Sequence, residues 1–112
     1  MKPAHKNMGV IKGVLREELE NSLRMKGHYE RELAKLPKGS LIKKRIKGRE
    51  YYYVVLRQNG KVKFIYKARI GKDEKDKYIK AKEYRAKYRK LLSQVKRQIR
   101  FLRGALRGKT PI

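Results

Sequence analysis

The dipeptide Asn59-Gly60 stands between two runs that are rich in β-branched and aromatic residues. Asparagine and glycine tolerate the left-handed backbone conformation of a tight hairpin turn, so this dipeptide predicts a pair of antiparallel strands. A second turn residue, Gly48, separates the first of these runs from another strand-like run before it. We therefore expect a three-stranded antiparallel meander with strands at residues 41–46, 51–57 and 61–70.

The register of the Asn59-Gly60 hairpin decides which side chains share a face, because a shift of one residue turns every side chain over. A two-residue turn pairs Val55 with Phe64. A three-residue loop at residues 58–60, with its glycine left-handed, pairs Val54 with Phe64 instead. We favour the three-residue loop because it gathers the apolar residues on one face.

In that register, two faces of the sheet differ sharply in composition. The core face holds one charged residue, Lys44, among Ile42, Ile46, Tyr52, Val54, Leu56, Val62, Phe64, Tyr66, Ala68 and Ile70. The outer face holds Lys43, Arg45, Tyr51, Tyr53, Val55, Arg57, Lys61, Lys63, Ile65, Lys67 and Arg69. The middle residue of the Tyr51 to Tyr53 run is thus expected in the core, with its two neighbours outside among the cations.

Helical periodicity flanks the expected sheet on both sides. Residues 9–36 repeat leucine or tyrosine at spacings near 3.6, which is typical of an amphipathic helix, and Pro37 and Gly39 end it. Residues 73–106 lack proline and begin with Asp73 as the expected N-cap. The predicted fold is a single α+β domain over residues 1–112: an N-terminal helix, the three-stranded antiparallel meander and a long C-terminal helix, with residues 1–8 and 108–112 flexible.

The long C-terminal helix outruns the sheet, since thirty-odd helical residues span roughly 50 Å. Its apolar residues follow a heptad pattern at Tyr88, Leu92, Val95, Ile99, Leu102 and Leu106. Its second half therefore packs on the first helix, which is the interpretation we favour, or pairs with a second chain as a homodimer. In the first helix, Gly27 is a candidate kink.

The charge of the chain restricts its partners. Among 112 residues, 34 are Lys or Arg and 10 are Asp or Glu, which gives a formal net charge of +24. Such an imbalance repels itself unless a polyanion neutralises it, so nucleic acid, DNA or RNA, is the expected partner. No apolar run approaches the roughly 18 residues of a membrane-spanning helix. The first ten residues lack the apolar core of a signal peptide, and there is no cysteine, so we expect a cytoplasmic protein.

No catalytic constellation emerges from the sequence. The serines have no evident base partner, and the carboxylates Asp73, Glu74 and Asp76 are typical of a helix start rather than of a metal site. We expect neither an enzyme nor a bound metal or cofactor.

The candidate nucleic-acid contacts lie on the outer sheet face and on the long helix, where lysine and arginine bind phosphates and tyrosine rings stack on bases. On the sheet they are Lys43, Arg45, Tyr51, Tyr53, Arg57, Lys61, Lys63, Lys67 and Arg69. On the helix they are Arg85, Lys87, Arg89, Arg97, Arg100 and Arg103, which we expect to follow a phosphate backbone.

The pieces "LPKGSL", "EYYY" and "GKV" within residues 30–78 resemble a family of small uncharacterised bacterial and archaeal proteins with the pattern LPKGSL…KG.EYYY…GKV…Y. This resemblance implies the order helix, three strands, helix, and no activity. The fold order is also similar to arm-type DNA-binding domains of tyrosine integrases, which insert a three-stranded sheet into the major groove, and to double-stranded-RNA-binding domains. The acids at the start of the last helix depart from the lysine cluster of the latter family.

Two other functions remain open on the same basic surface. One is a small phage or mobile-element inhibitor, similar to an anti-CRISPR protein, that docks on a nuclease or its guide-RNA complex. The other is a ribosome-associated protein.

Overall fold

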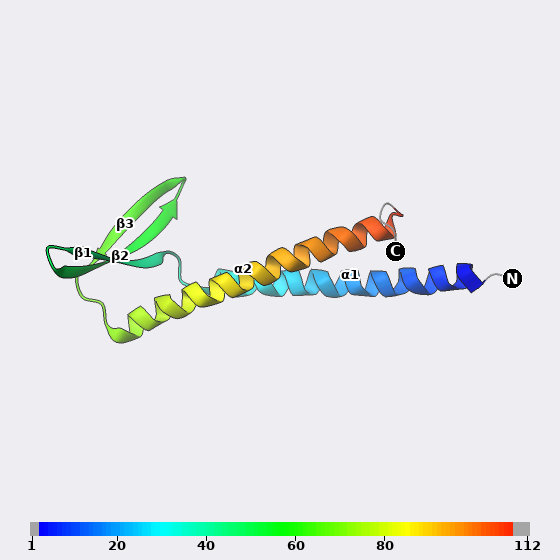
Figure 1. Cartoon of the computed structure of the whole chain (residues 1–112), viewed down its shortest axis with the longest axis horizontal. Coiled ribbons are helices and arrows are strands. Elements are labelled where there is room, and N and C mark those ends of the chain that lie inside the picture. The colour runs from blue at the N-terminus through cyan, green and yellow to red at the C-terminus, as the bar shows by residue number, and fades with distance from the viewer. Residues whose placement is uncertain (1–2, 109–112) are drawn as a thin grey trace. The chain divides into compact units, whose positions relative to one another are not determined.

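The computed structural model describes residues 3–108 and confirms the predicted α+β fold (Figure 1). The elements follow the order α1 (Pro3–Lys35), β1 (Ser40–Ile46), β2 (Arg49–Gln58), β3 (Lys61–Lys67) and α2 (Lys72–Leu106). The strands form one antiparallel sheet in the order β1-β2-β3. By their contacts these elements form two compact units. Residues 35–87 make up the sheet unit, whereas α1 up to Ala34 and α2 from Tyr88 make up the helical unit.

Several element boundaries differ from those expected. Helix α1 begins at Pro3 and runs without interruption through Gly27, while β3 ends at Lys67 and leaves residues 68–70 outside the sheet. The N–H of Lys75 donates to the carbonyl oxygen of Gly71 at 3.1 Å, so α2 begins before Asp73. Asp73 therefore sits in the first turn of the helix rather than at its N-cap. The flexibility expected at residues 1–2 and 109–112 concerns positions outside the described residues, and the single domain over residues 1–112 stays a prediction.

Both hairpin turns contain two residues with left-handed backbone. Lys47 and Gly48 have φ of 52° and 80°, and Asn59 and Gly60 have φ of 51° and 75°. Positive φ at both central residues defines the turn whose twist matches that of paired strands. Each loop is therefore two residues long. At the second hairpin this differs from the three-residue loop expected at positions 58–60.

The favoured prediction of the register is wrong. The short turns shift the pairing by one residue. Val55 pairs with Phe64 and Tyr53 with Tyr66, and in the other hairpin Ile42 pairs with Tyr53. Turn geometry prevails over the separation of apolar from charged residues, because the left-handed conformations of both loops allow only one pairing.

The sheet consequently has an open face and a covered face that differ from those expected. We define the open face by Ser40, Ile42, Lys44, Ile46, Arg49, Tyr51, Tyr53, Val55, Arg57, Val62, Phe64 and Tyr66. We define the covered face by Leu41, Lys43, Arg45, Glu50, Tyr52, Val54, Leu56, Gln58, Lys61, Lys63, Ile65 and Lys67. Residues of β2 lie on the faces expected for them, whereas those of β1 and β3 are exchanged.

The covered face packs at the centre of β2. Val54 is 3% exposed, and the Lys75 ammonium at the start of α2 lies 4.4 Å from the centroid of the Tyr52 ring. Gly39 approaches from the loop before β1: a Cβ atom there would lie 2.7 Å from a methyl group of Leu56 and 2.8 Å from one of Val54. The core of the sheet unit therefore lies on this side.

In the helical unit, α1 and the second half of α2 form an antiparallel pair. The amide of Gln98 donates to the Oγ of Ser22 at 2.8 Å, and the rings of Tyr29 and Tyr88 lie 6.0 Å apart. The expected heptad residues of α2 form the core, with Val95, Ile99 and Leu102 at 3%, 5% and 5% exposed. Packing on the first helix, the favoured interpretation of the long helix, is confirmed.

Candidate nucleic-acid interface

Aromatic rings cluster on the open face of the sheet. The Tyr66 ring lies 5.5 Å from the ring of Tyr53 and 6.1 Å from that of Tyr51, with tilted planes. Phe64 and Tyr66 are 55% and 51% exposed. These rings present their surfaces outward, although aromatic side chains of this size are usually buried.

Lys44 places a positive charge within this cluster. Its Nζ lies 4.8 Å from the centroid of the Phe64 ring and 5.4 Å from that of Tyr53. A cation over aromatic rings is attracted to their negative faces, by about 0.5–1 kcal/mol at an exposed site. The open face therefore joins ring surfaces, which can stack on planar groups, with a cation that can neutralise an anion beside them.

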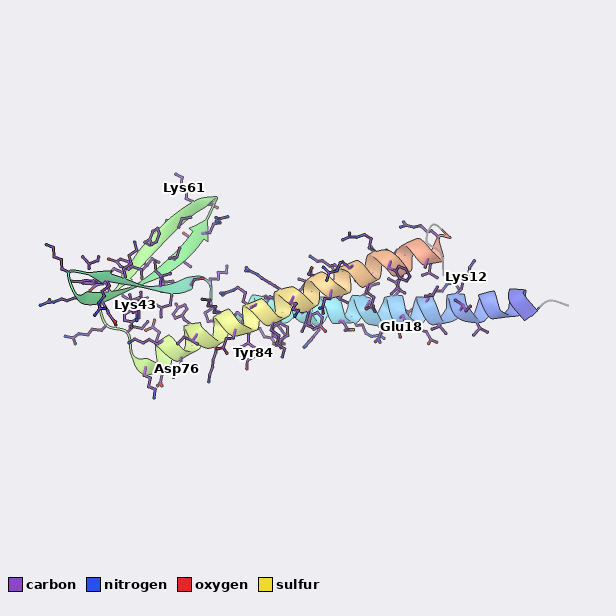
Figure 2. All side chains as sticks on the ribbon, in the orientation of Figure 1. Lys12, Glu18, Lys43, Lys61, Asp76 and Tyr84 are labelled. Carbon is purple, nitrogen blue, oxygen red and sulfur yellow. The ribbon has the colours of Figure 1, made fainter. Side chains whose placement is uncertain are left out.

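Most cations expected beside Tyr51 and Tyr53 lie on the opposite face. Five of the predicted sheet contacts lie on the covered face, namely Lys43, Arg45, Lys61, Lys63 and Lys67. Figure 2 labels two of them, Lys43 of β1 and Lys61 of β3. Lys43 is paired with Glu50 at 3.5 Å, and Lys67 with Glu74 at 3.6 Å. Arg69 lies past the end of β3. Of the predicted sheet contacts, Tyr51, Tyr53 and Arg57 alone share the open face, because the register turned the side chains of β1 and β3 over.

The predicted contacts on α2 fall into different surroundings. Arg85 donates to the carbonyl oxygen of Pro37 at 2.7 Å and so fastens the loop before β1 to the helix. Arg97 donates to the Oγ of Ser93 at 3.0 Å. Lys87 and Arg89 are exposed. Arg100 and Arg103 line a groove beside α1.

Sequence reasoning missed three members of the ring cluster on the open face, Lys44, Phe64 and Tyr66, which it assigned to the core. The signal that identifies them is the Asn59-Gly60 dipeptide itself, read as a two-residue turn. A two-residue turn exposes apolar residues, so the separation of apolar from charged residues favours the other register.

Within residues 9–108, no group of three or more His, Asp or Glu side chains is arranged to hold a metal ion. None of the helices in this part of the chain is long and apolar enough to cross a membrane. The chemistry that the site offers is ring stacking and charge neutralisation.

Comparison of the chain with known protein families, curated proteins and solved structures yields no match. The resemblances drawn from the residue patterns therefore stay predictions.

Proposed function

We propose that this protein binds nucleic acid without catalysing a reaction on it, and that unpaired bases stack on the open face of its sheet. The observation that carries the proposal is the ring cluster beside Lys44, in which Phe64 and Tyr66 are exposed and Tyr51 and Tyr53 are half-buried. Stacking on an aromatic ring suits any base, because every base has a π surface. The net charge of +24 supplies attraction to the phosphate backbone over longer distances.

The composition of the open face supports a single strand over a duplex. A sheet that reads a duplex groove needs cations and hydrogen-bonding groups along the face that enters it. The open face instead alternates rings and aliphatic side chains, with cations only at Lys44, Arg49 and Arg57. Stacked base pairs hide their flat surfaces, so rings of this kind serve DNA or RNA whose bases are unpaired. A cytoplasmic location belongs to the same proposal.

A pair of double variants on β3 tests this proposal. Phe64→Thr with Tyr66→Thr removes two rings from the open face, while threonine preserves the strand propensity. We expect affinity for a labelled single-stranded oligonucleotide to fall by at least about tenfold, since each stacked base contributes about 1–3 kcal/mol. The slope of affinity against salt concentration should stay unchanged, because no phosphate contact is removed.

The matched control is Lys61→Thr with Lys63→Thr on the covered face of the same strand. Because neither lysine lies beside the stacked bases, this variant should lose less affinity than the ring variant. Equal affinities for the ring variant and the unmodified protein would refute stacking on the open face. Circular dichroism on both variants verifies that the fold is retained.

Exposed aliphatic residues on the same face support a second candidate function, docking on another protein. Ile46 and Val62 are 46% and 49% exposed, and such side chains neither stack on bases nor bind phosphates. A nuclease or its guide-RNA complex would be the partner of an inhibitor of this kind. A defined protein that co-purifies after nuclease treatment supports docking, whereas loss of all partners on that treatment supports direct nucleic-acid binding.

A further inference from the structure

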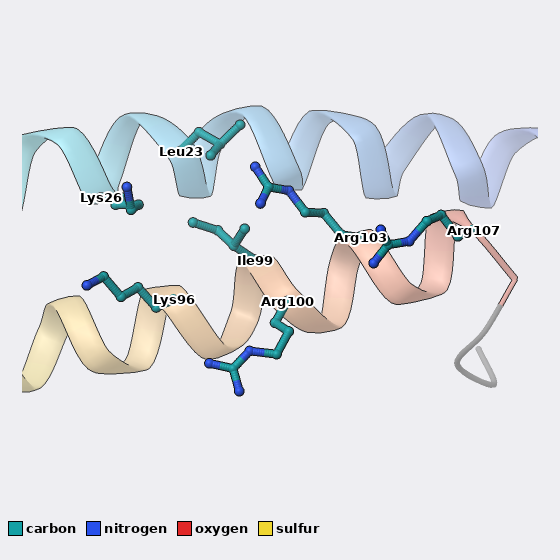
Figure 3. Close-up of a pocket in the computed structure, with 7 residues that line it drawn as sticks. All are labelled: Leu23, Lys26, Lys96, Ile99, Arg100, Arg103 and Arg107. Carbon is teal, nitrogen blue, oxygen red and sulfur yellow. The ribbon is translucent and has the colours of Figure 1, made fainter.

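A groove with cationic walls lies between α1 and the second half of α2, within the helical unit. It encloses about 400 Å³ (Figure 3). Five cations line it: Lys26 of α1 and Lys96, Arg100, Arg103 and Arg107 of α2. Leu23 and Ile99 supply its apolar lining, and Figure 3 shows Ile99 and Arg103 pointing from α2 toward α1.

The four cations of α2 form one continuous row. Their spacings of four, three and four residues place them on a single stripe of a helix, next to the buried row that contains Val95, Ile99 and Leu102. From Lys96 to Arg107 the stripe is roughly 16 Å long at 1.5 Å per residue. The same heptad pattern that packs the helices therefore holds the cations along the edge of their interface.

The four α2 cations of this row lack acidic partners within residues 9–108. Lys26 is paired with Glu30 at 3.5 Å, but across residues 9–108 no carboxylate forms an ion pair with the four α2 cations. The sequence contains no acid after Glu83. Like charges three or four positions apart on a helix repel one another, so the row is stabilised when an anion binds along it.

We propose that this groove binds the phosphates of a nucleic-acid strand, as a contact site separate from the open face of the sheet. Guanidinium groups bind phosphate oxygens with paired hydrogen bonds, and three of the five cations are arginines. Because a stacked strand advances about 3.4 Å per nucleotide and an unstacked one farther, a stripe of roughly 16 Å spans at most about five phosphates. The apolar lining at Leu23 and Ile99 suits the sugars of that strand, which inorganic polyphosphate lacks.

This site goes beyond the base stacking proposed for the sheet, because it uses other residues and other chemistry. Stacking rings determine affinity with little effect on salt dependence, whereas groove cations determine the salt dependence itself. The two proposals can therefore fail separately.

The test compares two double variants that remove equal charge from α2. Arg100→Gln with Arg103→Gln acts in the groove, and Arg89→Gln with Arg97→Gln acts outside it. Glutamine retains the helix propensity of arginine. Affinity for a fluorescein-labelled 20-nucleotide thymidine strand and for a 20-base-pair duplex is measured at several salt concentrations, with inorganic polyphosphate as competitor.

For the groove variant we expect an affinity loss of about tenfold or more, and a salt slope reduced by about 1.4 to 1.8 for two lost phosphate contacts. The control variant should lose less than about threefold, and a second groove variant, Lys96→Gln with Arg107→Gln, should repeat the larger loss. The groove variant should still lose more affinity than the control variant when both are made in the Phe64→Thr, Tyr66→Thr background, where stacking is removed.

Three outcomes would overturn the proposal. Equal losses in the groove and control variants would mean that net charge alone attracts the strand. Polyphosphate that binds the groove while both oligonucleotides do not would assign the site to a different anion. A ring variant that loses affinity, beside groove variants that bind as tightly as the unmodified protein, would leave the sheet as the binding surface and eliminate the groove.

Discussion

Lys43 and Lys44 are neighbours of identical charge in opposite surroundings. Successive residues of a strand point to opposite faces, so Lys43 reaches the carboxylate of Glu50 while Lys44 lies over the rings of Phe64 and Tyr53. Arg85 is likewise engaged within the fold, at the carbonyl oxygen of Pro37. The local partner of each cation thus determines whether it holds the fold together or lies beside the rings of the open face.

Gly39 is the residue whose replacement we expect to damage the sheet unit most. Its φ of 93° is left-handed, and a Cβ atom would lie 3.0 Å or closer to Val54, Val55 and Leu56. Gly39→Ala should lower the free energy of unfolding by at least about 1–3 kcal/mol, the cost of a strained backbone conformation. Chemical denaturation followed by circular dichroism measures the change.

Gly13→Ala is the matched control for that substitution. Gly13 lies inside α1, and an added Cβ atom would meet nothing within 4 Å. Alanine at this position should raise the free energy of unfolding by about 0.8–1 kcal/mol. The same substitution should therefore lower the free energy of unfolding at Gly39 and raise it at Gly13. A stabilising Gly39→Ala would contradict the close approach of Gly39 to β2.

Among the elements, the hairpins and the helix pair obtain their geometry in different ways. Two left-handed residues in each turn set the register of the sheet, even at the expense of exposed rings. The helix pair instead depends on a heptad row, in which Val95, Ile99 and Leu102 are buried against α1. Local backbone conformation thus governs the sheet, and side-chain packing governs the helices.

Adjacent residues of α2 test the role of this packing. Leu102 is 5% exposed whereas Phe101 is 51% exposed. Leu102→Ala should lower the free energy of unfolding by about 2–5 kcal/mol, because it removes packing and leaves a cavity. Phe101→Ala should change it by about 0.5 kcal/mol, as at other surface positions. Urea denaturation measures both changes. Similar losses of unfolding free energy for the two variants would mean that Leu102 does not lie in the interface between the helices.

For the molecule as a whole, uncompensated positive charge dominates the electrostatics. The formal net charge is +24, and the ion pairs Lys26–Glu30, Lys43–Glu50 and Lys67–Glu74 involve partly exposed side chains. Exposed pairs of this kind contribute about 0–1 kcal/mol each. Repulsion among the remaining cations therefore opposes folding until salt or a bound polyanion screens it.

We accordingly expect the melting temperature to rise when sodium chloride is increased from low to moderate concentration. Screening weakens repulsion between exposed charges, since the Debye length falls from about 30 Å at 0.01 M to about 10 Å at 0.1 M. Differential scanning calorimetry measures the shift. A melting temperature that falls over this range would show that attractive ion pairs outweigh the repulsion.

Much of the fold follows from local signals. The helical periodicities, the heptad of α2 and the glycine turns each act over a few residues, and they predict the element order and the α+β class. The candidate site was predicted in part: Tyr51, Tyr53 and Arg57 lie on the open face, but Lys44, Phe64 and Tyr66 join them in place of five predicted lysines and arginines. The difference arises because the two-residue turns determine the register even where apolar residues are left exposed.

The helices and strands were determined by residues close together in the sequence. Helix periodicity and tight turns each depend on residues only a few positions apart. The proposed binding surfaces depend on residues far apart in the sequence. Ser22 and Gln98 meet across 76 positions, and the groove beside them combines Lys26 with Arg103. Which cations pair with acids and which line the groove was decided by packing, because burial and the distances between charges exist only once the chain has folded.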